Sequence, residues 1–250
     1  MAKFDGIFDI QGTLKGMTFY KTAEGIRIRT KGGISKKRIM NDPAFARTRE
    51  NGAEFSHSAK MSQLLRHSVS TLVDNAKDSR TSSRLNQIMG RIKNMDTVNS
   101  RGERTVLEGL NNPLGLQELT GFDFNKNATL GSVLKKSFVF NAGDGTLALT
   151  DFINGKHLQL PAGATQIGLR IAASRIDFET KTYGFVESPQ EVLLVDLYTP
   201  TDTTLTLPAI PDGTGLLCFF FLIEFYQEIN GKAYPLKNKQ YNVLKLFAIG

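Results

Sequence analysis

From about residue 136 the sequence is a succession of short β-prone segments, and this feature constrains the fold more than any other. The period of two predicts strands at 136–142, 146–152, 157–160, 165–178, 182–187, 191–197, 203–207, 216–229 and 233–248, the last interrupted at Pro235. Asn, Asp and Gly residues occupy several connections, where tight turns need positive φ angles. Strands without helices between them indicate an antiparallel sandwich or barrel, and we expect a β-sandwich. Segment 216–229 begins apolar on both faces, which predicts a central strand.

The region between residues 41 and 110 has the apolar spacing of helices. Asp42 suits a helix cap, and Pro43 suits the first helical position because its missing N–H would have no partner there. The apolar residues that follow at near-helical spacing are Phe45, Phe55, Ala59, Leu65, Val69, Leu72, Val73 and Ala76. The residues that share one face of a second predicted helix, over about 82–95, are Leu85, Ile88, Met89, Ile92 and Met95. The pattern therefore predicts a helical hairpin joined near residues 78–81.

Residues 96–135 show the least regular pattern of the chain. One short helix is expected at 103–110, after which glycines and Asn111-Asn112-Pro113 interrupt the sequence. The leucines and phenylalanines between residues 114 and 124 are expected to be buried against other parts of the chain. We therefore expect 111–135 to be a partly packed connector between the two halves.

Residues 1–40 have the character of an extended arm that contains a β-hairpin. Two β-prone runs, 17–22 and 26–30, flank a short loop that ends in glycine. Alternation places two isoleucines on one side of the hairpin and two arginines on the other. An isolated hairpin is marginal in water, so it must dock on its own domain or on a neighbouring subunit. The residues expected at this interface are Phe19, Tyr20, Ile26 and Ile28.

Charge divides the chain near residue 110. Residues 1–110 hold 20 Lys+Arg against 11 Asp+Glu, whereas residues 111–250 hold 11 against 13, and the whole chain has a net charge of +7. Segment 26–49, which includes a basic loop over 31–38, concentrates the positive charge. Its cations are Arg27, Arg29, Lys31, Lys36, Lys37, Arg38, Arg47 and Arg49, with Asp42 as the one acid.

This basic segment has two candidate partners, an acidic protein surface and the phosphates of a nucleic acid. The hairpin and the glycine-rich spacing suit an arm held against a surface, and no known nucleic-acid-binding fold is recognisable in the sequence. We therefore favour contact with protein and keep nucleic acid as the alternative.

The residue types that carry chemistry do not gather in the sequence. His57, His67 and His157 lack partners at metal-ligand spacing, so surface or capping roles are expected. Cys218 lies in the apolar run 216–223, which predicts a small buried hydrophobe. The carboxylates of Asp177 and Glu179, two residues apart on a predicted strand, suit a solvated strand face, and the glycine-rich segments do not match nucleotide-binding motifs. We expect a protein that is not an enzyme and that has no metal or cofactor.

The first residues lack the apolar stretch of about 7–15 residues that a signal peptide requires. The run 216–223 is far shorter than the roughly 20 residues needed to span a bilayer. We therefore expect synthesis in the cytoplasm and no membrane partner.

The first 55 residues combine several short motifs. They are Gly12-Thr13-Leu14-Lys15-Gly16, Phe19-Tyr20-Lys21, Arg29 with Lys31-Gly32-Gly33, and Asp42-Pro43 with Arg47 and Arg49. In this combination residues 6–55 resemble a poorly characterised group of proteins from Bacteroidota and their phages or mobile elements. Members begin with a Gly-rich segment, an aromatic pair, an arginine and an Asn/Asp-Pro helix start. The resemblance implies no activity and no catalytic residues, and it favours a phage-like or self-assembling role.

The expected fold is α+β, with a basic arm and hairpin over 1–40, a helical region over 41–110, a connector over 111–135 and a β-sandwich over 136–250. The expected function is that of a non-enzymatic structural subunit. It would self-associate as a homo-oligomer, or join a virion, a filament or another particle, through its N-terminal arm. The alternative is a nucleic-acid-binding or packaging protein that uses segment 26–49. A ligand-binding sandwich is a third class, although the chain has no tryptophan for a sugar platform.

Overall fold

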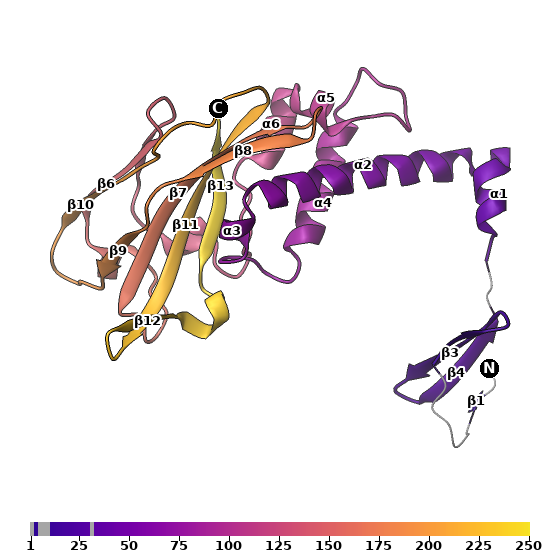
Figure 1. Ribbon diagram of the computed structural model, residues 1–250, viewed down its shortest axis with the longest axis horizontal. Helices are drawn as coiled ribbons and strands as arrows, with labels where there is room; N and C mark the ends of the chain where they lie inside the picture. The colour runs from indigo at the N-terminus through magenta and orange to yellow at the C-terminus, as the bar shows by residue number, and fades with distance from the viewer. Residues whose placement is uncertain (1–2, 5–10, 31–32) are drawn as a thin grey trace. The chain divides into compact units, whose positions relative to one another are not determined.

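The computed structural model describes residues 3–4, 11–30 and 33–250, and the chain divides into two compact units, Met1–Glu50 and Asn51–Gly250. Helices and antiparallel strands occur together (Figure 1), which confirms the α+β fold class. The sequence suggests boundaries near residues 40, 110 and 135. In the structure the division falls after Glu50, and the helices and strands beyond it share one unit.

The first unit contains a four-stranded antiparallel sheet with the strand order β1-β4-β3-β2. Its strands are β1 (Lys3–Phe4), β2 (Gly12–Leu14), β3 (Met17–Thr22) and β4 (Gly25–Thr30). Strands β3 and β4 form the predicted hairpin, in which Thr22 pairs with Gly25 across the turn. Gly25 has a φ of 116°, a conformation that a residue with a side chain rarely adopts.

Part of the predicted basic loop is helical. Helix α1 (Lys36–Asn41) begins at Ser35, whose hydroxyl accepts a hydrogen bond from the Arg38 N–H at 3.2 Å. Serine favours this capping position. The expectation of an extended arm over residues 1–40 is therefore wrong from residue 36 onward, where the chain is helical. Asp42 does cap the next helical segment, η1 (Pro43–Phe45), by accepting from the Ala44 N–H at 2.9 Å, and α2 (Ala46–Ser68) follows directly.

The second unit is built around strand β11 (Leu216–Ile229), whose bounds match the predicted central strand. Its long partner is β7 (Gln166–Asp177), and together they lie in the middle of a six-stranded antiparallel sheet. The outer strands of this sheet are β8 (Thr182–Glu187) and β9 (Glu191–Leu194) beside β7, and β12 (Lys232–Pro235) and β13 (Val243–Ile249) beside β11. The 3-10 helix η2 (Leu236–Lys239) separates β12 from β13, which confirms the predicted break at Pro235.

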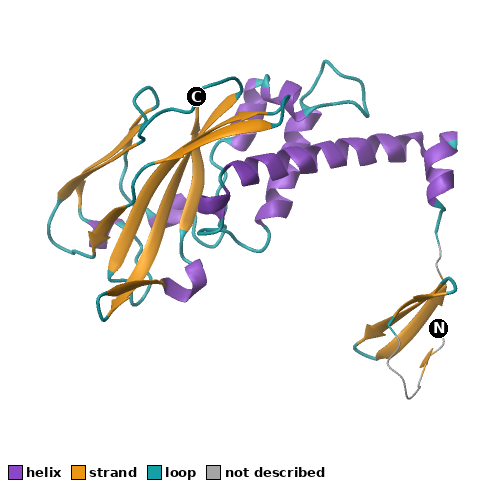
Figure 2. Cartoon of the chain, viewed as in Figure 1, coloured by secondary structure: helices purple, strands orange, loops and turns teal. Residues whose placement is uncertain are grey.

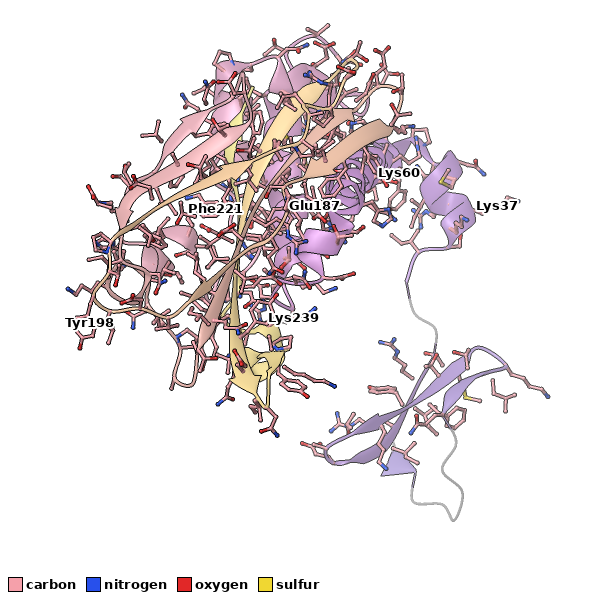
Figure 3. The ribbon with its side chains drawn as sticks, turned by 60° about the vertical axis from the view of Figure 1, so that its left-hand side comes forward. Lys37, Lys60, Glu187, Tyr198, Phe221 and Lys239 are labelled. Atoms are coloured by element: carbon pink, nitrogen blue, oxygen red, sulfur yellow. The ribbon has the colours of Figure 1, made fainter. Side chains whose placement is uncertain are left out.

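A second, three-stranded sheet packs on one face of the large sheet (Figure 2). Its strands are β5 (Val139–Asn141), β6 (Thr146–Phe152) and β10 (Thr201–Thr206), in the order β10-β6-β5. Phe219, Phe221 and Ile223 of β11 belong to the apolar core that includes this sheet, and Figure 3 labels Phe221. Helices cover the opposite face of the large sheet, where Phe220 and Leu222 enter a separate core. The unit therefore has a helical layer in addition to the expected sandwich.

The helical layer contains the predicted second helix, α4 (Thr81–Asn94), with Leu85, Met89 and Ile92 buried on one face as expected. The other helices are α3 (Ser70–Val73), α5 (Val106–Leu110), α6 (Pro113–Leu119), α7 (Leu130–Val133) and α8 (Asn154–His157). The predicted strand at 157–160 is reduced to one antiparallel β-bridge, between Leu158 and Leu134. His157 ends α8, and its Nδ1 accepts a hydrogen bond from the Ile153 N–H at 3.0 Å, which closes the helical turn.

Two glycines let the helices approach one another at backbone distance. A Cβ atom added at Gly109 of α5 would lie 2.0 Å from the carbonyl oxygen of Ile92 on α4. A Cβ at Gly115 of α6 would lie 2.0 Å from the carbonyl oxygen of Gly109. A larger side chain at either position would therefore separate these helices.

A buried ion cluster centred on Glu54 of α2 joins three segments of the second unit. The Glu54 carboxylate accepts from Arg104 Nε at 2.8 Å, from Arg104 Nη2 at 2.9 Å and from the Gly102 N–H at 2.8 Å. Lys93 of α4 donates to the same carboxylate, which is only 4% exposed. The hydrogen bonds from Arg104, supported by Lys93, hold the pKa of Glu54 well below its usual range in spite of burial.

Asp96 orders the loop that carries Arg104. Its carboxylate accepts from the backbone N–H groups of Val98 and Asn99 at 2.9 Å each and of Thr105 at 2.7 Å. Burial opposes the charge, but these hydrogen bonds outweigh burial and lower the pKa of Asp96 to about 2. The irregular segment after α4 is thus tied to the helical layer.

Replacing Gly109 with alanine should destabilise the protein by about 1–3 kcal/mol, because the new methyl group pushes α5 away from α4. The matched control is Gly90→Ala on α4, where the added Cβ meets no atom within 4 Å. The free energy of unfolding of that variant should rise by about 0.5–1 kcal/mol, because alanine has a higher helix propensity than glycine. Urea unfolding measures both changes, and equal effects of the two variants would contradict the close approach.

Replacing Glu54 with glutamine should lower the free energy of unfolding at pH 7 by about 3–5 kcal/mol, because Lys93 and Arg104 lose a buried counter-charge. The folded state lowers the pKa of Glu54 from its ordinary value of 4.5. Its contribution is therefore complete above that value and disappears as the pH falls below it. Urea unfolding between pH 7 and pH 3 should show a steeper acid loss in the wild type than in Glu54→Gln. The exposed control Glu191→Gln should behave as the wild type, and parallel pH curves for all three proteins would exclude the cluster as the cause.

Candidate functional site

The sheet of the first unit has one apolar face. Directly paired residues on neighbouring strands share a face, and the pairs here are Phe19 with Ile28, Lys21 with Ile26, and Leu14 with Met17. The residues that define this apolar face are Leu14, Met17, Phe19, Ile26 and Ile28. Three of the four predicted interface residues, Phe19, Ile26 and Ile28, thus share this face.

The apolar face has no core beneath it in the described part of the first unit. Leu14 is 59% exposed and Met17 is 40% exposed. Within residues 11–30 and 33–50, no side chain reaches the burial typical of a core, whereas the second unit buries two extended apolar clusters. A small sheet of this kind gains little stability by itself and needs a surface that covers its apolar side.

The opposite face of the same sheet is polar and aromatic. Tyr20 pairs with Arg27, and Thr18 pairs with Arg29, so both arginines share this face. The Arg29 guanidinium lies 5.5 Å from the centre of the Tyr20 ring, and Arg27 pairs with Glu24 at the hairpin turn. The two neighbouring aromatic residues of the sequence motif therefore belong to different faces.

Arginines organise the corner between α1 and α2. Arg49 Nη1 donates to the carbonyl oxygens of Ile39 at 2.7 Å and of Asp42 at 3.0 Å. Arg38 contacts the Asp42 carboxylate at 3.1 Å and lies 5.6 Å from the centre of the Phe45 ring. The hydrogen bond from the Ala44 N–H and the contact with Arg38 lower the pKa of Asp42. Part of the predicted basic patch therefore serves the local fold.

The remaining cations differ in their partners. Arg47 pairs with Glu50 at 3.2 Å, and Lys31 lies outside the described residues. Lys36 and Lys37 are exposed on α1, where Figure 3 labels Lys37. Neither lysine has an acidic partner within the described ranges. Lys36, Lys37 and Arg29, which contacts the Tyr20 ring, are thus the cations of the segment without an acidic or carbonyl partner in the described part of the chain.

The cysteine and a partly buried histidine of the second unit have structural environments. Burial raises the pKa of the Cys218 thiol to about 12, so the expected role as a buried hydrophobe is confirmed. His57 is partly buried, and its Nε2 accepts from the Val106 N–H at 3.0 Å, in line with the expected capping role. Across residues 3–4, 11–30 and 33–250, no group of three or more His, Cys, Asp or Glu side chains could hold a metal ion.

Asp177 and Glu179 do not share a strand face, contrary to the expectation from the sequence. Strand β7 ends at Asp177, and Glu179 lies in the turn that leads to β8. The Asp177 carboxylate accepts from the backbone N–H groups of Glu179 at 2.8 Å and of Thr180 at 3.0 Å, so it shapes this turn. An aspartate that can accept hydrogen bonds from the backbone two and three residues later is the sequence signal for such a turn.

No helix in the described ranges has the length and apolar character needed to cross a membrane. No protein-family model matches the chain, and comparisons with curated proteins and with solved structures give no match.

Proposed function

We propose that this chain is a non-enzymatic structural subunit that self-associates through its N-terminal unit. The observation that supports the proposal is the apolar face of the N-terminal sheet, which lacks a core in the described part of its own unit. A second copy presents the same apolar side chains, so the face of one copy can cover the face of another. Such a self-complementary contact is the arrangement of a two-fold symmetric interface.

The energetics of the apolar face are consistent with association. Removing one Leu, Ile, Phe or Met side chain fully from water contributes about 1.5–3 kcal/mol. When the five residues of the face are buried in two copies, the free energy that their burial contributes exceeds the lower part of the roughly 4–15 kcal/mol that association costs. The face therefore supports an interface of modest affinity, which further contacts can strengthen.

The nucleic-acid alternative retains fewer free cations than the sequence count suggests. Arg27, Arg38 and Arg47 have acidic partners, and Arg49 donates to backbone carbonyls. Lys36, Lys37 and Arg29 remain as the described cations best placed to meet phosphates. This distribution favours a protein partner over a phosphate backbone.

The test is light scattering coupled to size-exclusion chromatography over a range of protein concentrations. Wild-type protein should show a mass above the 27.6 kDa of one chain. The double variant Ile26→Thr/Ile28→Thr keeps the β-branched character of the strand but removes apolar surface, so it should weaken association at least about tenfold. The matched control is Arg29→Thr on the same strand and the opposite face, which should associate as the wild type.

A wild-type protein that remains at 27.6 kDa at every concentration would contradict the proposal, as would equal losses for the two kinds of variant. The alternative is distinguished by its salt dependence. A nucleic-acid-binding protein should bind an RNA or DNA oligonucleotide with an affinity that falls steeply between about 50 and 200 mM salt. Arg29→Thr should weaken that binding, whereas the isoleucine variant should not.

A further inference from the structure

A cavity of 690 Å³ opens between the helical layer and one end of the large sheet in the second unit. Leu107 and Leu110 of α5 and Leu116 of α6 line it from the helical side. Ile176 and Leu216, from β7 and β11, line it from the sheet. Phe178 completes an apolar interior of the size expected for a binding pocket.

The rim of this cavity is acidic although the whole chain carries a net charge of +7. Asp177 and Glu179 line it, and no lysine or arginine occurs among its described lining residues. The hydrogen bonds that Asp177 accepts from Thr180 and, at 2.9 Å, from the Thr214 hydroxyl lower the pKa of its carboxyl, so it is charged at neutral pH. The exposed Glu179 carboxylate has no basic partner in the described part of the chain.

The segment over residues 34–40 has the complementary chemistry. Ile34 is 49% exposed and Met40 is 56% exposed, and Lys36 and Lys37 lie between them. In a helix, residues three and four positions apart share a face, so both lysines of α1 lie near Met40. Methionine is flexible enough to fill an irregular apolar cavity.

We propose that residues 34–40 of a second copy of this chain occupy the cavity. Met40 enters the apolar interior between α5, α6 and β7, and Lys36 and Lys37 approach Asp177 and Glu179 at the rim. Charge complementarity and the pairing of an exposed apolar side chain with an apolar cavity both select this occupant. The inference rests on the proposed self-association and assigns it a receiving surface.

The contact differs in kind from the pairing of two apolar sheet faces. Residues 34–40 and the cavity are different surfaces of the chain, so each copy can donate one segment and receive another. Such a head-to-tail contact produces a ring when the rotation between copies closes and a filament when it does not. Combined with the two-fold contact of the apolar faces, it allows assemblies larger than dimers.

Charge reversal tests the contact. Lys36→Glu/Lys37→Glu and Glu179→Lys should each weaken association about tenfold at low salt, measured as the shift in the concentration at which the scattering mass rises. Asp177 is left unchanged because it shapes the turn. Matched controls are Lys135→Glu/Lys156→Glu and Glu191→Lys, which reverse exposed charges away from the cavity and should leave association unchanged.

The decisive protein carries Lys36→Glu, Lys37→Glu and Glu179→Lys together. If the two sites meet, the restored opposite charges should recover part of the lost association, so the combined effect is smaller than the sum of the separate effects. Met40→Gln should also weaken association, since it places a polar group in the apolar interior. Thermal unfolding of each variant verifies that its fold is intact.

The two proposals fail in different ways. A wild type that stays monomeric contradicts self-association itself. A second outcome is that the wild type associates, that Ile26→Thr/Ile28→Thr weakens association, and that the charge reversals have no effect or strictly additive effects. This outcome retains the proposed function. That second outcome would overturn the assignment of the cavity.

Discussion

Strand β11 has apolar side chains on both faces, and the two cores of the second unit depend on this property. Phe220 and Leu222 extend the core under the helices, while Phe219 and Phe221 extend the core under the small sheet. The long antiparallel pairing with β7 fixes the register from Leu216 to Tyr226. Because side chains alternate along a strand, a shift of one residue would exchange the two sets of side chains between the cores. The helical layer and the small sheet are thus both positioned by one strand.

The sequence predicts β11 well because its apolar run is long and lies between clear turn residues. Helix α4 is predicted for a similar reason, since its buried residues recur at helical spacing. The predicted strand at 157–160 is reduced to one β-bridge at Leu158, because His157 ends a helical turn that the hydrogen bond from the Ile153 N–H closes. The packing of helices on the sheet depends on contacts between residues far apart in sequence, such as Gly109 against Ile92, and pattern alone does not supply them.

The candidate site shows the same division between local and distant information. The period of two predicts that the isoleucines and arginines of the hairpin lie on opposite faces. The register of β3 with β4 places them on opposite faces in the structure. The roles of the individual cations do not follow from composition, because a count of charges ignores where the acids and carbonyl oxygens lie. Arg49 is the clearest case, since its two carbonyl acceptors are seven and ten residues away. The acidic cavity is also hidden from the sequence, because its lining comes from five separate stretches of chain.

The contrast between the two units gives the physical reason to expect assembly. The second unit covers both faces of its large sheet with its own chain, so each face has an apolar core within one copy. The described part of the first unit has an apolar sheet face without such cover, and segment 34–40 adds exposed apolar side chains next to unpaired lysines. An apolar sheet face without a core beneath it is a surface that contact with a partner stabilises. In the proposed assembly, the acidic cavity of one copy receives segment 34–40 of another copy, whose lysines carry the opposite charge.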